Sequence, residues 1–124
     1  NDMNIGRGCN RVLAQNDPTA HAEVVAIRDA CTHLKSFQLE DCEIYTSCEP
    51  CPMCMGAIYW ARPSKVFYAA TRHDAANAGF DDSLIYKELT VPMHQRQIEM
   101  INLEREKSCE LFREWTDKPD KVDY

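Results

Sequence analysis

The sequence predicts an α/β sandwich that contains parallel strand pairs. Short runs rich in β-branched and aromatic residues alternate with segments whose apolar residues recur at helical spacing. The chain of 124 residues has no internal repeat, linker or low-complexity tract, so residues 1–124 are expected to form a single domain.

The spacing of the apolar residues along the chain predicts the individual helices and strands. Residues 3–10 are expected to be the end of a strand, and a helix is expected from about residue 19 to residue 34. Asp17 is the expected N-cap of this helix and Pro18 its first residue. The remaining expected elements are a strand at 43–47, a helix from the cysteines to 62–63, a strand at 65–70, helical turns within 72–79 and 83–89, a strand at 98–103 and an amphipathic helix at 108–115.

Two short segments carry metal-binding side chains. One contains His21, and the other contains Cys51 and Cys54, flanked by prolines that mark the start of a helix. The i, i+3 spacing places both sulfurs on one helical face, near the positive end of the helix, where thiolates are favoured. One imidazole and two thiolates leave the fourth position of a tetrahedral zinc ion for a water molecule, which is typical of catalytic zinc sites.

Glu23 is the expected proton carrier of this site. Two thiolates cancel the formal charge of Zn²⁺, so the metal acidifies water less than it does with imidazole ligands alone, and a nearby base is needed. His21 and Glu23 would lie about 200° apart on an ideal helix. We therefore expect both residues where the backbone enters the helix.

Other readings of the cysteines remain open. Cys-x-x-Cys also occurs in redox pairs, and Cys48, Cys51 and Cys54 have the spacing of an iron–sulfur loop. Neither reading explains His21 and Glu23, and a purely structural zinc site needs a fourth protein ligand. The pattern favours catalytic zinc over a structural zinc site or a redox pair.

The composition of the chain indicates which cellular compartment and which class of substrate to expect. The net charge of −6 disfavours a polyanionic partner, so no nucleic acid is expected and a small neutral or zwitterionic substrate is favoured. No run of transmembrane length and no secretory signal pattern is present. Seven cysteines, three of them clustered, suit a reducing cytoplasm better than a disulfide framework.

The chain resembles the bacterial-type guanine deaminases of the cytidine/deoxycytidylate deaminase-like superfamily. The resemblance rests on residues 16–23, 45–54, 56–63 and 78–83. The first two segments are shared with tRNA adenosine deaminases, whereas the last two, together with Tyr124, point to guanine. The resemblance implies a three-layer α-β-α sandwich of the cytidine-deaminase type with a mixed, partly parallel sheet. It also implies zinc-dependent hydrolysis of guanine to xanthine and ammonia, in purine catabolism or salvage.

The resemblance also implies roles for individual residues. His21, Cys51 and Cys54 would bind one Zn²⁺ per subunit, Glu23 would be the principal proton shuttle, and Asp82 would help to protonate the departing amine. The implied substrate-binding residues are Asn10, Ala22, Phe80, Tyr124 and Trp60.

Structural roles remain open for several of these positions. Asp82 could cap a helix together with Asp81, and Asn10 could be a turn residue. Phe80 and Trp60 are aromatic residues that belong to the core by default. Trp60 lies about 180° around its helix from Cys51, so it would reach a pocket only across an interface. A terminal Tyr124 is ordinarily disordered.

The family is expected to form a homodimer in which residues 104–124 are exchanged, so that Tyr124 closes the partner's site. The family's N-terminal helix and first strand, with a Gly-Pro-Phe-Gly-like turn, have no counterpart in this sequence, which therefore is either a truncation or lacks an inner strand. The competing functions are deamination of tRNA adenosine, cytidine or guanosine, and a non-catalytic zinc-stabilised interaction module.

Overall fold

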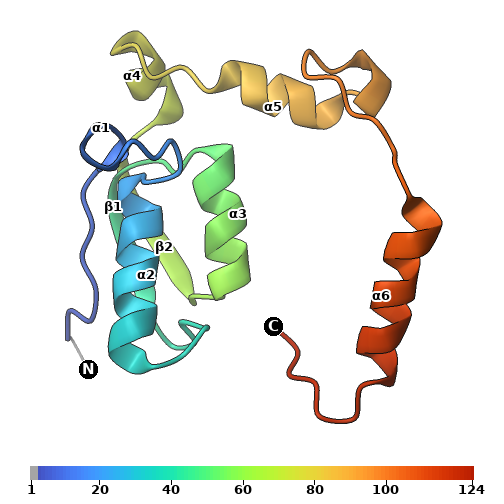
Figure 1. Ribbon diagram of the computed structural model, residues 1–124. Coiled ribbons are helices and arrows are strands. Elements are labelled where there is room, and N and C mark those ends of the chain that lie inside the picture. Colours follow the sequence, from blue (N-terminus) through green and yellow to red (C-terminus); the bar gives the residue numbers. More distant parts are fainter. Residues whose placement is uncertain (1–2) are drawn as a thin grey trace. The chain divides into compact units, whose positions relative to one another are not determined.

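The structure is a computed structural model that describes residues 3–124, so the first two residues of the predicted domain lie outside it. The chain forms two compact units, Asn1–Tyr86 and Lys87–Tyr124, which are described separately (Figure 1). Within the described residues, none of the helices combines the length and the apolar character needed to cross a membrane.

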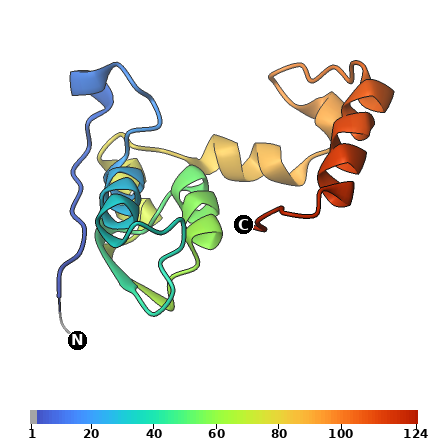
Figure 2. The ribbon, with the colours of Figure 1, turned by 60° about the horizontal axis from the view of Figure 1, so that its bottom comes forward.

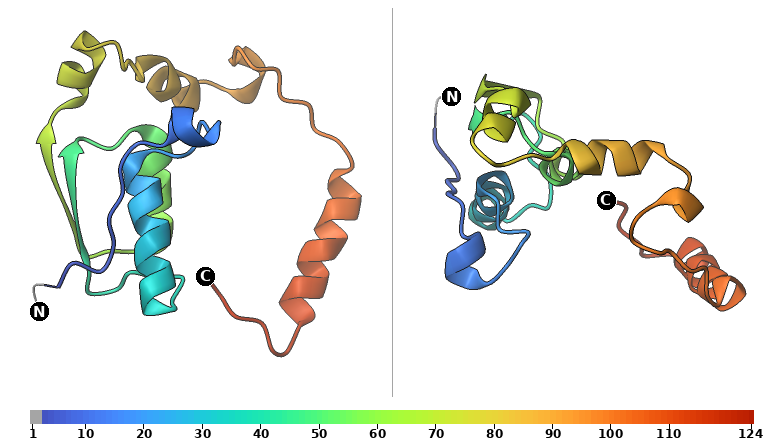
Figure 3. Two further views of the ribbon diagram at one scale, coloured as in Figure 1. Left: turned by 60° about the vertical axis from the view of Figure 1, so that its left-hand side comes forward. Right: turned by 90° about the horizontal axis from the view of Figure 1, so that it is seen from above.

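The first unit is built on a small parallel sheet. β1 (Glu43–Cys48) pairs in parallel with β2 (Lys65–Ala70). α2 (Ala22–Leu34) and α3 (Pro52–Ala61) lie against the same face of this sheet (Figures 1 and 3). Because α3 connects the two strands, β1, α3 and β2 form a βαβ unit, as the alternation of strands and helices predicts.

The buried cluster of this unit is contributed by α2, by the end of α3 and by the segment that precedes β1. Ala30, Leu39 and Ala61 form a buried cluster. Along β1, half-buried residues alternate with exposed ones, because successive side chains of a strand point to opposite faces. On the exposed face, the rings of Tyr45 and Phe67 stack with their centroids 4.7 Å apart.

Residues 3–11 run along α2 and form no strand within the described part of the chain, so the strand predicted at 3–10 is wrong (Figure 2). Two glycines allow this close approach. A Cβ atom at Gly6 would lie 2.7 Å from the Ala30 Cβ, and one at Gly8 would lie 2.3 Å from the Ala22 carbonyl oxygen. These glycines permit contact with a helix rather than weakening a strand.

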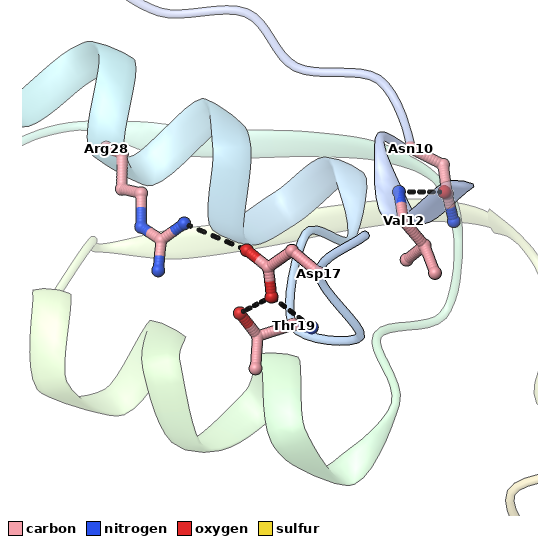
Figure 4. Close-up of polar contacts among 5 residues, drawn as sticks. All are labelled: Asn10, Val12, Asp17, Thr19 and Arg28. Atoms are coloured by element: carbon pink, nitrogen blue, oxygen red, sulfur yellow. Dashed lines mark hydrogen bonds and ion pairs between the residues drawn. The ribbon is translucent and has the colours of Figure 1, made fainter. Parts of the chain in front are cut away.

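The N-cap predicted for α2 is also wrong, because the helix begins at Ala22 with His21 as its N-cap. Asp17 instead organises the preceding turn: its Oδ1 accepts hydrogen bonds from the Thr19 N–H at 2.8 Å and the Thr19 hydroxyl at 2.6 Å (Figure 4). Such local bonding is typical of aspartate in turns. An unpredicted short helix, α1 (Val12–Gln15), precedes this turn.

Two short helices follow the sheet, as predicted. α4 (Arg72–Asn77) has a capping box, in which the Thr71 hydroxyl and the Asp74 carboxylate each accept the other residue's backbone N–H. α5 (Ser83–Thr90) follows a turn at Gly79, whose φ of 98° favours glycine.

The second unit contains the end of α5, a 3₁₀ turn η1 (Met93–Gln95) and α6 (Arg105–Asp117). The predicted C-terminal helix is confirmed, but the strand predicted at 98–103 is wrong. This segment has no neighbouring strand in the described structure, and a strand needs a partner for its backbone groups. Apolar side chains remain exposed in this unit: Ile98, Ile101, Leu103, Leu111, Phe112 and Trp115.

Candidate zinc site

The site lies at the end of the first unit where the carboxyl ends of β1 and β2 meet the N-terminal ends of α2 and α3 (Figure 3). His21 is the N-cap of α2 and Cys51 is the N-cap of α3. Pro52 takes the first helical position of α3, so Cys54 lies in its first turn. Both helix N-termini therefore direct positive partial charge toward the cysteine sulfurs.

The three predicted ligands are brought together. His21 Nδ1 lies 3.5 Å from Cys51 Sγ and 3.6 Å from Cys54 Sγ. All three donor atoms lie within 4.8 Å of one another. In a tetrahedral zinc site with ordinary bond lengths, nitrogen and sulfur ligands are about 3.6 Å apart. The donor set therefore fits a tetrahedral zinc ion without rearrangement, and three side chains leave one ligand position open.

The two cysteine thiols share a proton unequally. A hydrogen bond from the Cys54 side chain, assisted by backbone N–H groups and the His21 charge, lowers the pKa of Cys51 to about 5 despite partial burial. The same hydrogen bond raises the pKa of Cys54, and burial and the Glu23 carboxylate raise it further. The pair of thiols therefore holds its shared proton on Cys54.

Glu23 lies in the first turn of α2, as its spacing from His21 predicts. Its Oε2 lies 3.4 Å from Cys54 Sγ, and its Oε1 accepts a hydrogen bond of 3.1 Å from the Thr46 hydroxyl. The carboxylate is thus held directly beside the metal donors, where a proton carrier for a bound water would be needed.

Sequence reasoning missed Thr46. It lies on the half-buried face of β1, two residues before Cys48. Its position near the carboxyl end of a parallel strand, on the face toward the helices, is the signal that would have found it.

Two other predicted residues have local roles in the structure. The Asn10 Oδ1 accepts the Val12 N–H at 3.0 Å at the start of α1 (Figure 4). The Asp82 backbone carbonyl accepts the N–H groups of Ile85 and Tyr86, so Asp82 immediately precedes α5. Across residues 3–124, no hydrogen bond or ion pair joins Asn10 or Asp82 to the zinc ligands.

The aromatic candidates lie at the surface. Phe80 is 76% exposed and Trp60 is 64% exposed, so the default reading of both as core residues is wrong. Tyr124 ends the second unit, and Ala22 is the first residue of α2.

The chain belongs to the family described as the cytidine and deoxycytidylate deaminase zinc-binding region, which residues 1–70 match. The metal of the His21, Cys51 and Cys54 group is therefore zinc, and the predicted fold class is confirmed.

Within this family the chain is similar to guanine deaminase of Bacillus subtilis (strain 168). The two are 55% identical over 120 residues, which cover 97% of this chain and 77% of the relative. The X-ray structure of guanine deaminase from Bacillus subtilis matches with a TM-score of 0.93 and 55% identity, covering 97% of this chain and 76% of that chain. A tRNA-specific adenosine deaminase of Buchnera aphidicola subsp. Schizaphis graminum is 41% identical over 70 residues, which cover 56% of this chain and 46% of the relative.

Proposed function

We propose that this protein is a zinc-dependent guanine aminohydrolase, which converts guanine and water to xanthine and ammonia. The observation that carries the proposal is the placement of the Glu23 carboxylate 3.4 Å from a sulfur of a three-ligand zinc site. The similarity to guanine deaminase over 97% of the chain supports guanine as the substrate.

The residues divide the proton transfers between them. A zinc ion held by His21, Cys51 and Cys54 would lower the pKa of a water molecule and so supply the nucleophile. Glu23 takes a proton from the attacking water and delivers it to a ring nitrogen while the water oxygen bonds to C2 of guanine. The C2 hydroxyl then gives up its remaining proton as it becomes the carbonyl of xanthine, this proton passes to the exocyclic amine with the help of Asp82, and the bond from C2 to the exocyclic nitrogen breaks, so that the amine leaves as ammonia.

The substrate contacts are also proposals. Asn10 uses its Oδ1 to accept the Val12 N–H, which leaves its side-chain N–H groups to donate to a purine. Exposed Phe80 offers a ring face on which a purine can stack. Ala22 lies between His21 and Glu23 and would contact the base from the start of α2, and Trp60 would contribute only across an interface between subunits.

The C-terminal segment would complete the site in a homodimer. We propose that residues 104–124 are exchanged between subunits, that Tyr124 closes the partner's site, and that residues 1–124 form one domain in this assembly. The exposed apolar side chains of the second unit support this arrangement, because a group of such residues on one segment marks an interaction surface.

The main alternative is deamination of an adenosine in tRNA. The tRNA-specific relatives match 53% to 72% of this chain, whereas guanine deaminase matches 97%. Because a net charge of −6 also disfavours a polyanion, we propose a free purine as the substrate. A reducing cytoplasm and a role in purine catabolism or salvage belong to the same proposal, supported by the seven free cysteines.

An ammonia-release screen tests the proposal. The purified protein is incubated with guanine, guanosine, adenine, cytosine and cytidine, and its zinc content is measured on the same sample. We expect release from guanine, with much slower release from the other four compounds and about one zinc per chain. A zinc-loaded, folded protein that leaves guanine unchanged would rule the activity out.

A further inference from the structure

We infer that Thr46 is a positioning residue for Glu23, acting through a hydroxyl that fixes the carboxylate beside the zinc ligands. The inference deepens the proposed deamination and rests on it.

The contact joins a rigid side chain to a flexible one. Thr46 is β-branched and lies in β1, where it pairs with Tyr68 of β2, so its hydroxyl has a fixed direction. Glu23 has three rotatable side-chain bonds and loses conformational freedom only when something holds its end. The 3.1 Å hydrogen bond from Thr46 Oγ1 to Oε1 supplies this hold.

The hold selects one orientation of the carboxylate. With Oε1 bound to Thr46, Oε2 faces Cys54 Sγ at 3.4 Å. One oxygen is therefore kept by the protein, and the other is directed to the metal donors, where the water and the purine would exchange a proton. Loss of the hydroxyl would leave Glu23 present but free to rotate away.

The Thr46 hydroxyl lies between two acceptors. Its Oγ1 is 3.1 Å from Glu23 Oε1 and 3.0 Å from the Cys48 carbonyl oxygen. The second contact ties the hydroxyl to the end of β1, next to the segment that carries the cysteine ligands.

Kinetics of three variants test the inference. For Thr46→Val, which removes the hydroxyl with little change of shape, we expect kcat on guanine to fall about 10- to 100-fold while KM changes less than about threefold. Thr46→Ser should restore kcat to within about threefold of the unmodified protein because it restores the donor. Ser47→Ala is the matched control, since it removes a hydroxyl from the exposed face of the same strand and should change neither constant.

Zinc content and unfolding provide readouts apart from activity. Thr46→Val should keep its zinc, because Thr46 is not one of the three metal donors. In a double-mutant cycle with Glu23→Ala, the fall in Tm of the double variant should be smaller than the sum of the two single falls, because both substitutions remove the same hydrogen bond.

The outcomes separate this inference from the proposed function. If the unmodified protein deaminates guanine but Thr46→Val has unchanged kcat, or if Thr46→Ser is as impaired as Thr46→Val, Thr46 does not position Glu23. If the shifts in Tm of the two single variants add up to the shift of the double variant, Thr46 and Glu23 do not form a stabilising hydrogen bond. If the unmodified protein does not act on guanine, the proposed function fails, and the unfolding cycle still decides whether Thr46 holds Glu23.

Discussion

Cys54 Sγ and Glu23 Oε2 lie 3.4 Å apart, so a zinc ligand and the proposed proton carrier are in direct contact. The negative charge of Glu23 contributes to the raised pKa of the Cys54 thiol. The same contact places the carboxylate beside the atoms that would hold the zinc ion, where a proton carrier for a bound water is needed.

The roles of Glu23 and the zinc ligands should therefore separate on substitution. We expect Glu23→Gln to keep zinc, because the three donors remain, while kcat on guanine falls by about 10²- to 10⁴-fold. Zinc analysis and steady-state kinetics on one preparation measure both effects. Glu40→Gln, which alters an exposed carboxylate outside the site, is the control. Unchanged turnover in Glu23→Gln would show that another group carries the proton.

Zinc binding should release a proton from Cys54. At pH 8 the Cys51 thiol, with its pKa of about 5, is already ionised, whereas Cys54 still holds its proton. Because zinc binds thiolates, loading the metal-free protein should release about one proton per zinc, and the affinity should rise about tenfold per pH unit near this pH. Calorimetry in buffers of different ionisation enthalpy measures the number. Release of two protons, or of none, would contradict the unequal sharing.

Two glycines should respond to alanine in opposite directions. In Gly8→Ala the new Cβ would meet the Ala22 carbonyl oxygen at 2.3 Å, so we expect the free energy of unfolding to fall by about 1–3 kcal/mol. Gly56 lies inside α3 with nothing within 4 Å of its Cβ position. Gly56→Ala should raise the free energy of unfolding by about 0.5–1 kcal/mol. Chemical denaturation of both variants checks the two signs, and equal effects would refute the close packing at Gly8.

Neighbouring carboxylates should have separable roles. Asp82→Asn is expected to lower kcat without lowering Tm, because the Asp82 contacts come from its backbone carbonyl, which the substitution keeps. Steady-state kinetics on guanine and thermal unfolding of the Asp82→Asn variant measure kcat and Tm. If kcat is unchanged, Asp82 has no part in the departure of the amine.

Asp81→Asn is the matched variant. Hydrogen bonds from the Ser83 backbone N–H and hydroxyl hold the pKa of Asp81 below its ordinary value of 3.8. A lowered folded-state pKa stabilises the protein above the unfolded pKa, and this stabilisation is lost as the pH falls through the folded pKa. Asp81→Asn should therefore reduce the loss of Tm below about pH 4 while leaving kcat near its original value. An unchanged dependence of Tm on pH would show that the hydrogen bonds from Ser83 to the Asp81 carboxylate do not stabilise the protein.

Exchange of the C-terminal segment can be tested by mixing two inactive proteins. Removal of residues 122–124 should reduce activity more than zinc content, and Glu23→Ala should be inactive with an intact tail. If tails are exchanged, a mixed dimer has one site with Glu23 and the tail of the other chain, so unfolding and refolding the two together should restore activity. Each protein refolded alone is the control. Absence of restoration in a mixture shown to contain mixed dimers would contradict the exchange.

The sequence alone determined the local parts of this protein. The sequence marks the apolar runs that become β1 and β2, the start of α3 at the cysteines and the His-x-Glu pattern that begins at His21, because each is a pattern of residues near each other in the chain. Turn chemistry, i, i+3 spacing and strand alternation act over a few residues, so they can be recognised in the order of the amino acids.

Tertiary structure decided what depends on distant neighbours. Residues 3–10 and 98–103 have the composition of strands, but a strand exists only where another backbone pairs with it, and these segments have no such neighbour in residues 3–124. In the same way, Thr46 meets Glu23 because the packing of α2 on β1 brings together two residues 23 positions apart. Sequence patterns that act over a few residues do not predict such contacts, because the packing of the helices and strands determines which distant residues meet.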